Sequence, residues 1–162
     1  MKQIFLIMGI LLLAFHTTPA QDTAFRYNAS GLEVTKPGQI KVLIEKLGEE
    51  SKQWGLTENK IRNAVEEKLQ NFKITSLPES DFSLPYRLYL ELQVLDSVFQ
   101  IRISFERVVS YRVGKEEYHT FASVFQRNSI GINSKKEGDH PLKILNRFLD
   151  DFLDAYRKAN QR

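Results

Sequence analysis

The sequence contains no cysteine among its 162 residues. A chain without thiols forms no disulfide, uses no cysteine nucleophile and builds no thiolate metal site. Histidine is also scarce, because His16 lies among the first twenty residues and only His119 and His140 follow it. These two residues form no HxxxH-type pair, so we expect neither a metal site nor a cofactor.

The motifs of several common enzyme classes are missing as well. The chain has no GxSxG, no P-loop and no GxGxxG. Its acidic residues occur in adjacent doublets, at Glu49–Glu50, Glu66–Glu67, Glu116–Glu117 and Asp150–Asp151. Adjacent residues on a helix do not face each other, whereas a glycosidase needs two carboxylates from separate elements in one cleft. The sequence therefore favours a protein that is not an enzyme, and a cell-wall hydrolase is the least favoured alternative.

Long runs of positive charge are also absent. The formal net charge is +3, and no run of Lys or Arg exceeds two residues, as at Lys135–Lys136 and Arg157–Lys158. Proteins that bind nucleic acid concentrate Lys and Arg in a basic patch or stripe. We therefore expect no nucleic-acid partner.

The longest apolar run lies at the N-terminus. Lys2 precedes an apolar stretch from Ile4 to Phe15, and small residues follow it up to Ala20. This pattern predicts a secretory signal peptide at residues 1–20, cleaved after Ala20. About a dozen apolar residues are too few for the ~20 that a membrane-spanning helix needs. The prediction is a periplasmic or secreted protein with no membrane span after cleavage, and an uncleaved N-terminal anchor is the alternative.

Signal cleavage would leave two further segments. Residues 21–38 show no sustained periodicity and contain Asn28, Gly31 and Pro37, which predicts an irregular N-terminal arm. Residues 39–160 have the periodicity of a single α+β domain. A chain of this size buries roughly two thirds of its unfolded surface and folds without disulfides.

Hydrophobic periodicity predicts six regular elements in the order β-α-β-β-β-α. They are a strand at 39–47, a helix at 57–71 with Thr57 as its N-cap, strands at 86–94, 99–113 and 117–128, and a helix capped by Asp139 or His140. Residues 49–53 are predicted as loop, and residues 73–85 as a connector with a short strand at 72–75. Three consecutive strands form an antiparallel meander. We therefore predict a two-layer sandwich with a mostly antiparallel sheet and both helices on one face.

The strand 99–113 alternates between an apolar and a polar face. Its apolar side chains, which we expect beneath the helices, are Phe99, Ile101, Ile103, Phe105, Val109, Tyr111 and Val113. The alternation slips at Arg107, which indicates either a β-bulge or the end of the covered part of the sheet. Neither face of the strand 117–128 is charged, which favours a central strand covered on both sides.

The other side of the predicted 86–106 hairpin is polar. It carries Arg87, Tyr89, Glu91, Gln93, Gln100, Arg102, Ser104 and Glu106. One interpretation is a solvated face whose charges pair across the strands. The other is a docking surface, because arginine and aromatic residues are enriched in protein interfaces. These eight residues are the candidate binding residues.

Aromatic residues leave two further alternatives open. Trp54, which precedes the first helix, is either an interface anchor or a cover for the end of the core. Eleven Phe and six Tyr provide enough aromatic surface to line a cavity for an apolar ligand such as a lipid. They are equally able to fill a close-packed core.

Three segments carry a resemblance to known proteins: GLTENKIRNAVEEKLQNFKI, LYLELQVLDSVFQIRISF and FLDDFLDAYRKANQR. In element order the chain resembles small envelope accessory domains of Gram-negative bacteria. These are the N-terminal domain of the Tol–Pal translocation protein and the periplasmic auxiliary components of ABC transporters. The resemblance implies a non-enzymatic module that binds another cell-envelope protein, with a lipid carrier as the alternative. It assigns a role to no individual residue.

Overall fold

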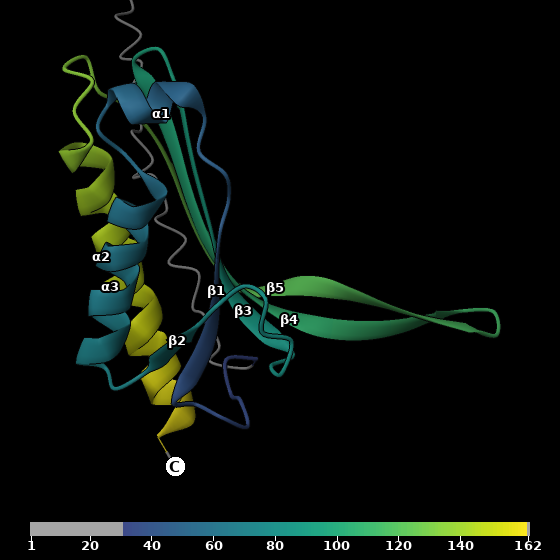
Figure 1. Ribbon diagram of the computed structural model, residues 1–162. Coiled ribbons are helices and arrows are strands. Elements are labelled where there is room, and N and C mark those ends of the chain that lie inside the picture. The colour runs from purple at the N-terminus through teal and green to yellow at the C-terminus, as the bar shows by residue number, and fades with distance from the viewer. Residues whose placement is uncertain (1–30, 162) are drawn as a thin grey trace, which may run out of the picture.

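The computed structural model describes residues 31–161, which form one mixed sheet and three helices (Figure 1). The strands are β1 (Gln39–Ile44), β2 (Thr75–Leu77), β3 (Tyr86–Leu95), β4 (Val98–Val113) and β5 (Glu116–Ile132). The helices are α1 (Glu49–Gln53), α2 (Glu58–Asn71) and α3 (Asp139–Asn160). The predicted α+β class is confirmed. The predicted signal peptide, its cleavage after Ala20 and the N-terminal arm up to residue 30 lie outside the described residues.

The five strands are ordered β2-β1-β3-β4-β5 across the sheet. β3, β4 and β5 pair antiparallel, as predicted for a meander, whereas β1 runs parallel to both of its neighbours. The β1–β2 pair is parallel because α2 carries the chain back along the sheet between these two strands. β5 is the last strand in this order, and only Phe125 of its residues is buried. The prediction of a central strand covered on both sides was therefore wrong.

Helix α2 begins where the sequence predicts. The Thr57 Oγ accepts a hydrogen bond of 3.1 Å from the Lys60 backbone N–H, which satisfies one of the free donors at the helix start. Ile61, Val65 and Leu69 recur at helical spacing and are all buried. The polar side of the helix meets α3 through an ion pair of 2.6 Å between Lys68 and Asp150.

The core lies between the sheet and the two long helices, which run side by side on one side of it (Figure 1). Aromatic rings fill much of this layer. Phe152 of α3 stacks on Phe105 of β4 at 5.5 Å between ring centroids and meets Phe125 of β5 edge-on at 5.4 Å. Tyr156 packs on the same Phe105 ring, and burial raises the pKa of its hydroxyl. That hydroxyl donates a hydrogen bond to the Pro37 carbonyl oxygen.

β4 and β5 continue together well beyond the point where β3 begins. Tyr86 at the start of β3 pairs with Arg107, and the Val108 N–H still donates to the Pro85 carbonyl oxygen at 2.8 Å. Residues Val108–Phe121, all exposed, form what we call the projecting hairpin. It extends away from the rest of the molecule (Figure 1). Its turn begins at Gly114 with a φ of 65°, a conformation that a side chain would disfavour.

A β-bulge lies at the root of the projecting hairpin. Phe105 pairs with Phe125 but Glu106 pairs with Ser123, so Val124 has no residue opposite it. The Ser123 hydroxyl donates to the Phe125 carbonyl oxygen across the bulge. The extra residue therefore stands on β5, although the slip in β4 had indicated a bulge close by.

Because the extra residue is on β5, the phase of β4 is not corrected. Arg107 keeps the helix side of the strand, and its guanidinium donates to the Gly31 carbonyl oxygen. The second interpretation of the slip, an end of the covered sheet, also describes this position. Val109, Tyr111 and Val113 are exposed on the projecting hairpin, so their predicted place beneath the helices was wrong.

Three local predictions near element ends were also wrong. The predicted loop at 49–53 is the short helix α1. The short strand lies at 75–77 rather than 72–75, because Lys73 takes a φ of 59° as the chain leaves α2. Helix α3 has Gly138 as its N-cap with no side-chain hydrogen bond, so neither Asp139 nor His140 caps it.

Candidate functional site

The eight candidate residues lie together on the face of the sheet that points away from the core, here called the outer face. The register of β3 and β4 brings them into four directly opposed pairs: Arg87 with Glu106, Tyr89 with Ser104, Glu91 with Arg102, and Gln93 with Gln100. The alternation of the two strands thus predicts which side chains share a face. It also shows which of them are neighbours across the strands.

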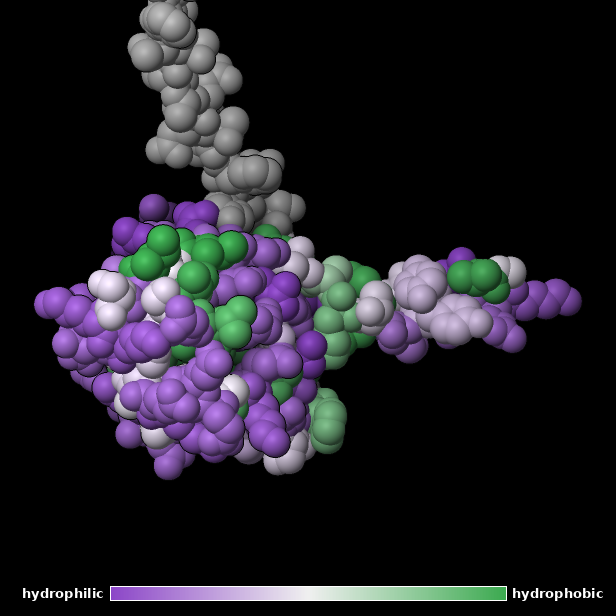
Figure 2. All heavy atoms as spheres, turned by 90° about the horizontal axis from the view of Figure 1, so that it is seen from above, coloured by the Kyte–Doolittle hydropathy of each residue, from purple (hydrophilic) through white to green (hydrophobic). Residues whose placement is uncertain are grey.

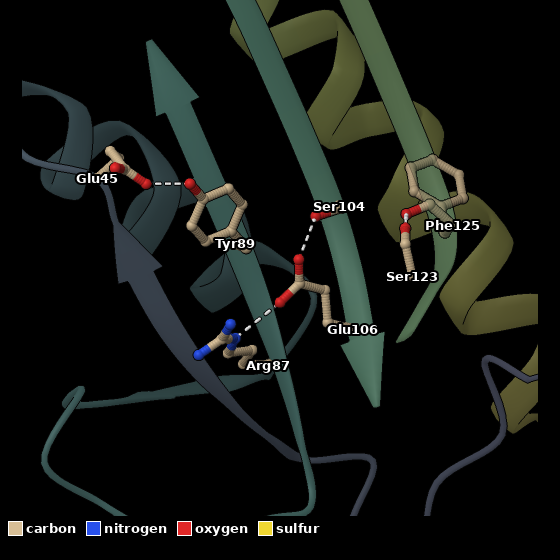
Figure 3. A network of polar contacts seen from close by, with 7 residues as sticks. All are labelled: Glu45, Arg87, Tyr89, Ser104, Glu106, Ser123 and Phe125. Atoms are coloured by element: carbon tan, nitrogen blue, oxygen red, sulfur yellow. Dashed lines mark hydrogen bonds and ion pairs between the residues drawn. The ribbon is translucent and has the colours of Figure 1, made fainter. Parts of the chain in front are cut away.

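The charged members of this face pair with one another. Arg87 Nε lies 2.8 Å from Glu106 Oε2, and the Ser104 hydroxyl donates to the other oxygen of Glu106 at 3.1 Å (Figure 3). Arg102 Nη2 lies 2.6 Å from Glu91 Oε2. Except for the more open Arg102, these charged side chains are largely buried by their neighbours. The structure therefore contains the cross-strand charge pairs of the solvated-face interpretation, and these charges already have protein partners.

Tyr89 occupies the middle of the polar face. Its hydroxyl donates a hydrogen bond to the Glu45 carboxylate, which lies just past the end of β1 (Figure 3). Burial, and then this hydrogen bond, raise the pKa of the hydroxyl, so it remains a donor at neutral pH. The guanidinium of Arg102 lies over its ring at 5.4 Å from the centroid. This arrangement holds the ring in one position between the two ion pairs.

One end of the outer face is apolar. Leu95, Val98 and Ile132 are neighbours across β3, β4 and β5, and Ile130 lies opposite Gln100. Their exposed fractions are 72%, 40%, 74% and 67% in the order Leu95, Val98, Ile132 and Ile130, so the four side chains form one contiguous exposed group. We call these four residues the aliphatic patch. Figure 2, which views the molecule from this end, shows hydrophobic residues gathered on the surface of the body.

The projecting hairpin is a second exposed feature. The rings of Tyr111 and Tyr118 stack across its two strands with centroids 5.6 Å apart. On its opposite face Ser110 Oγ and His119 Nδ1 are joined by a hydrogen bond of 2.8 Å. Phe121, at the root of that face, lies beneath the guanidinium of Arg87 at 3.8 Å from the ring centroid. The hairpin face that carries His119 therefore continues the outer face of the sheet.

Trp54 lies inside the molecule. Only 5% of the residue is exposed, and its ring meets Phe99 edge-on with centroids 6.2 Å apart. Its carbonyl oxygen accepts a hydrogen bond from the Gly138 N–H, which joins the end of α1 to the start of α3. This is the arrangement in which the tryptophan covers the end of the core, and the ring is not accessible to a partner.

A hollow of about 590 Å³ lies beside β1 and is bordered by Glu45, Glu58 and Glu79. Two of these three carboxylates already have partners. Glu45 is bound by Tyr89, and Glu58 forms an ion pair of 3.0 Å with Arg62. Within residues 31–161, no group of three or more His, Cys, Asp or Glu is placed to hold a metal ion. No helix in this range has the length and apolar character required to cross a membrane.

Comparison with known proteins leaves the family open. No model of a known protein family matches the chain, and no curated protein matches it. The resemblance in element order to envelope accessory domains therefore remains a prediction.

The aliphatic patch is the surface that sequence reasoning missed. Leu95 and Val98 flank the turn at Asp96 and Ser97. The alternation of their strands places both side chains on the same face as the polar residues. The last predicted strand stops at residue 128, before Ile130 and Ile132, whereas β5 continues to Ile132. The alternation of N-S-I-G-I in phase with Gln126 and Asn128 was the signal that would have extended the last strand and placed both isoleucines on the outer face.

Proposed function

We propose that this protein is a non-enzymatic accessory module that binds another protein of the cell envelope through its outer face. In this proposal the body is a two-layer sandwich whose helices cover one face of the sheet and leave the other for a partner. The aliphatic patch carries the proposal. Burying an exposed apolar surface is the main favourable contribution to protein association, and exposed clusters of this kind mark interaction sites.

The surroundings of the patch match the anatomy of an interface. Gln93 and Gln100 lie directly beside it, and the Glu91–Arg102 ion pair forms the next row. An apolar centre bordered by polar groups is the usual arrangement at non-obligate interfaces. The ion pairs hold the row rigid, so few side chains lose freedom when a partner binds.

Export belongs to the same proposal. The predicted signal peptide directs the chain to the envelope, and the chain has no cysteine for lipid attachment. A partner reached there is a protein of the envelope. The opposed polar pairs and the aliphatic patch favour recognition of a complementary protein surface over chemistry on a small molecule. The carboxylates Glu91 and Glu106 are each committed to an arginine.

The test is site-specific photo-cross-linking in the native cells. A photoreactive residue placed at Ile130 is expected to give a discrete cross-linked band that contains one envelope protein. The matched control places the same residue at Glu67, an exposed-side position of α2. A band of equal yield from both positions, or none from Ile130, would contradict the proposal.

A charge substitution provides a second readout. Ile130→Asp places a carboxylate in the aliphatic patch at a residue that is 67% exposed, so the fold has little to lose. Capture of the partner identified by cross-linking is expected to fall at least tenfold, with an unchanged circular-dichroism melt. Ile130→Val is the control and retains capture. Undiminished capture by Ile130→Asp would remove the patch from the interface.

A further inference from the structure

β5 forms one edge of the sheet, and no other strand of the described chain pairs with its second side. Beside the body this edge is long, because it runs from Phe125 to Ile132 without a proline. Its single charge, Arg127, points to the helix side, where its Nε lies 3.1 Å from Asp151. Proteins protect such an edge with charges, prolines or bulges, or they cover it with another segment. The bulge of β5 lies before this stretch, so we expect another segment of the chain to cover it.

The backbone phase of β5 shows which residues face this edge. The Leu90 carbonyl oxygen accepts a hydrogen bond from the residue that follows β1, so Ile103, which pairs with Leu90, directs its backbone groups to β5. The partner of Ile103 on β5 is Arg127. By alternation, Asn128 and Ile130 direct their N–H and C=O groups to the other side of β5, with their side chains on the outer face. A segment that pairs with this edge therefore bonds to these two residues.

The described chain begins beside the same edge. A Cβ atom at Gly31 would stand 3.1 Å from the Cβ atom of Val124, the bulge residue of β5. The Gly31 carbonyl oxygen accepts a hydrogen bond of 3.3 Å from the Arg107 guanidinium. Asn160, at the end of α3, donates to the Leu32 carbonyl oxygen at 2.9 Å. These contacts fix the point at which the preceding segment joins the fold.

We infer that residues 23–30 form a sixth strand of the sheet, paired antiparallel with residues 125–132 of β5. The two segments are equally long, and each spans about 26 Å when extended. The opposite course, along the projecting hairpin, would run parallel to β5. Parallel pairs are slightly less stable than antiparallel pairs and less frequent. The inference concerns the chain's own N-terminal segment and does not depend on the proposed envelope partner.

Gly31 sets the register of this pairing, because it stands beside Val124. Each step back along the chain from Gly31 then meets one step forward along β5. Tyr27 comes opposite Asn128, whose backbone groups face this edge, so the two residues exchange both of their hydrogen bonds. The side chains of a directly opposed pair lie on the same face of a sheet. The ring of Tyr27 therefore lies on the outer face.

The sequence of the segment fits this register. Phe25, Tyr27 and Ala29 occupy alternate positions, and Arg26 lies between the two aromatic residues. This period of two is typical of a strand with one apolar face. In the inferred register Phe25 lies opposite Ile130, and an aromatic ring beside a β-branched side chain is a favourable cross-strand pair. The aliphatic patch therefore continues onto the sixth strand.

A pair of introduced cysteines tests the course of the segment, because the chain has none of its own. In a hydrogen-bonded antiparallel pair the Cα atoms lie about 5.5 Å apart, within the range that a disulfide spans. Tyr27→Cys with Asn128→Cys is therefore expected to close an intramolecular disulfide under mild oxidation. The matched control combines Tyr27→Cys with Thr120→Cys, because Thr120 is equally many residues from Val124 in the other direction. Mass spectrometry of the digested protein measures both yields.

Each outcome of this experiment decides the course of the segment. A disulfide yield from the Asn128 pair at least tenfold above that from the Thr120 pair supports the sixth strand. A higher yield from the Thr120 pair would place the segment along the projecting hairpin. Equal yields, or no disulfide from either pair, would show that the segment does not pair with β5. Each of these last results overturns the inference.

Hydrogen exchange tests the pairing without cysteines. In the inferred register the Tyr27 N–H points to β5, whereas the Arg26 N–H points away from it. Tyr27→Pro therefore removes a hydrogen bond of the ladder, and Arg26→Pro does not. Tyr27→Pro is expected to speed exchange of the Asn128 amide about tenfold, and Arg26→Pro to leave it nearly unchanged. Equal exchange in the two variants would refute the inference. So would an Asn128 amide that exchanges in the original chain as fast as that of His119, on the hairpin part of the same edge.

Discussion

The ring of Phe99 lies directly across the backbone of Gly131. The two residues are paired between β4 and β5, and a Cβ atom at position 131 would stand 2.4 Å from Cζ of the ring. Phe99 is almost fully buried and has little room to move, because Trp54 and His140 pack on it edge-on. Because Gly131 of the edge strand β5 has no side chain, the large ring of Phe99 on β4 has room to close this end of the core.

Gly131→Ala is expected to destabilise the fold by about 1–3 kcal/mol, the usual cost of overpacking a core. The methyl group must displace Phe99, and with it the contact to Trp54. Chemical denaturation followed by tryptophan fluorescence measures the change, because Trp54 is the single tryptophan. Gly38→Ala is the control, since a Cβ there meets nothing within 4 Å. Equal stability of the two variants would show that the ring adapts freely.

An ion pair ties the β3–β4 turn to the loop before α3. Lys136 Nζ lies 2.7 Å from Asp96 Oδ1, and this hydrogen bond lowers the pKa of Asp96 and raises the pKa of Lys136. The contribution of Asp96 to stability is present above its unfolded pKa and is lost as pH falls through its lower folded pKa. The contribution of Lys136 is present below its unfolded pKa and is lost as pH rises through its higher folded pKa. The Asp96–Lys136 ion pair therefore stabilises the fold between roughly pH 4 and pH 10.

Lys136→Met is expected to move the titration midpoint of Asp96 upward, toward the ordinary range of an aspartate. NMR detection of the side-chain carboxyl carbon against pH measures the midpoint. Lys135→Met removes the adjacent positive charge without touching the hydrogen bond, and it is expected to leave the midpoint nearly unchanged. A shift of equal size in both variants would mean that general charge, rather than this contact, lowers the pKa of Asp96.

The projecting hairpin is expected to be dispensable for folding of the body. Within the described chain, no residue between Phe105 and Phe125 belongs to the buried hydrophobic core. Val109 and Thr120 are directly opposed, and they are the hydrogen-bonded pair because the Val108 N–H points to Pro85 on the other side. Residues 110–119 can therefore be replaced by an Asn-Gly turn that joins them.

This shortened chain is expected to melt within about 2–4 °C of the original, a shift that corresponds to roughly 1 kcal/mol in a domain of this size. Circular dichroism is the measurement. A larger fall in the melting temperature would show that the hairpin stabilises the body, and the Arg87–Phe121 contact at its root would be the first place to examine.

Alternation in the sequence was sufficient to predict the polar part of the outer face. The residues from Tyr86 to Val94 and from Phe99 to Phe105 occupy the expected sides, and the Thr57 cap marks the start of α2 as predicted. These features are local, since each depends on spacing within a few residues. The paired positions of Arg87 and Glu106 then follow from a tight turn between two strands.

Which part of a strand is covered by other elements was not predictable in the same way. Val109, Tyr111 and Val113 continue the apolar alternation of β4, yet they lie beyond the start of β3 and are exposed. Whether another element covers a strand depends on the lengths of the other strands and helices. The alternation of residues within one strand does not indicate those lengths. The uncharged faces of β5 misled for the same reason. An apolar stripe indicates that a surface is suited to burial, but the burying partner can be a second molecule.

Val124 affects the direction of the projecting hairpin without taking part in the strand pairing. The residue stands outside the pairing of β4 with β5, and the ladder is regular on both sides of it. A bulge bends its strand and increases the local twist. The direction in which the hairpin points therefore depends on one residue that has no pairing partner on β4. Loss of that residue would redirect about a dozen surface residues while leaving every pairing in the sheet in register. The geometry of any assembly built on the hairpin is thus free to change without a change in the strand pairing.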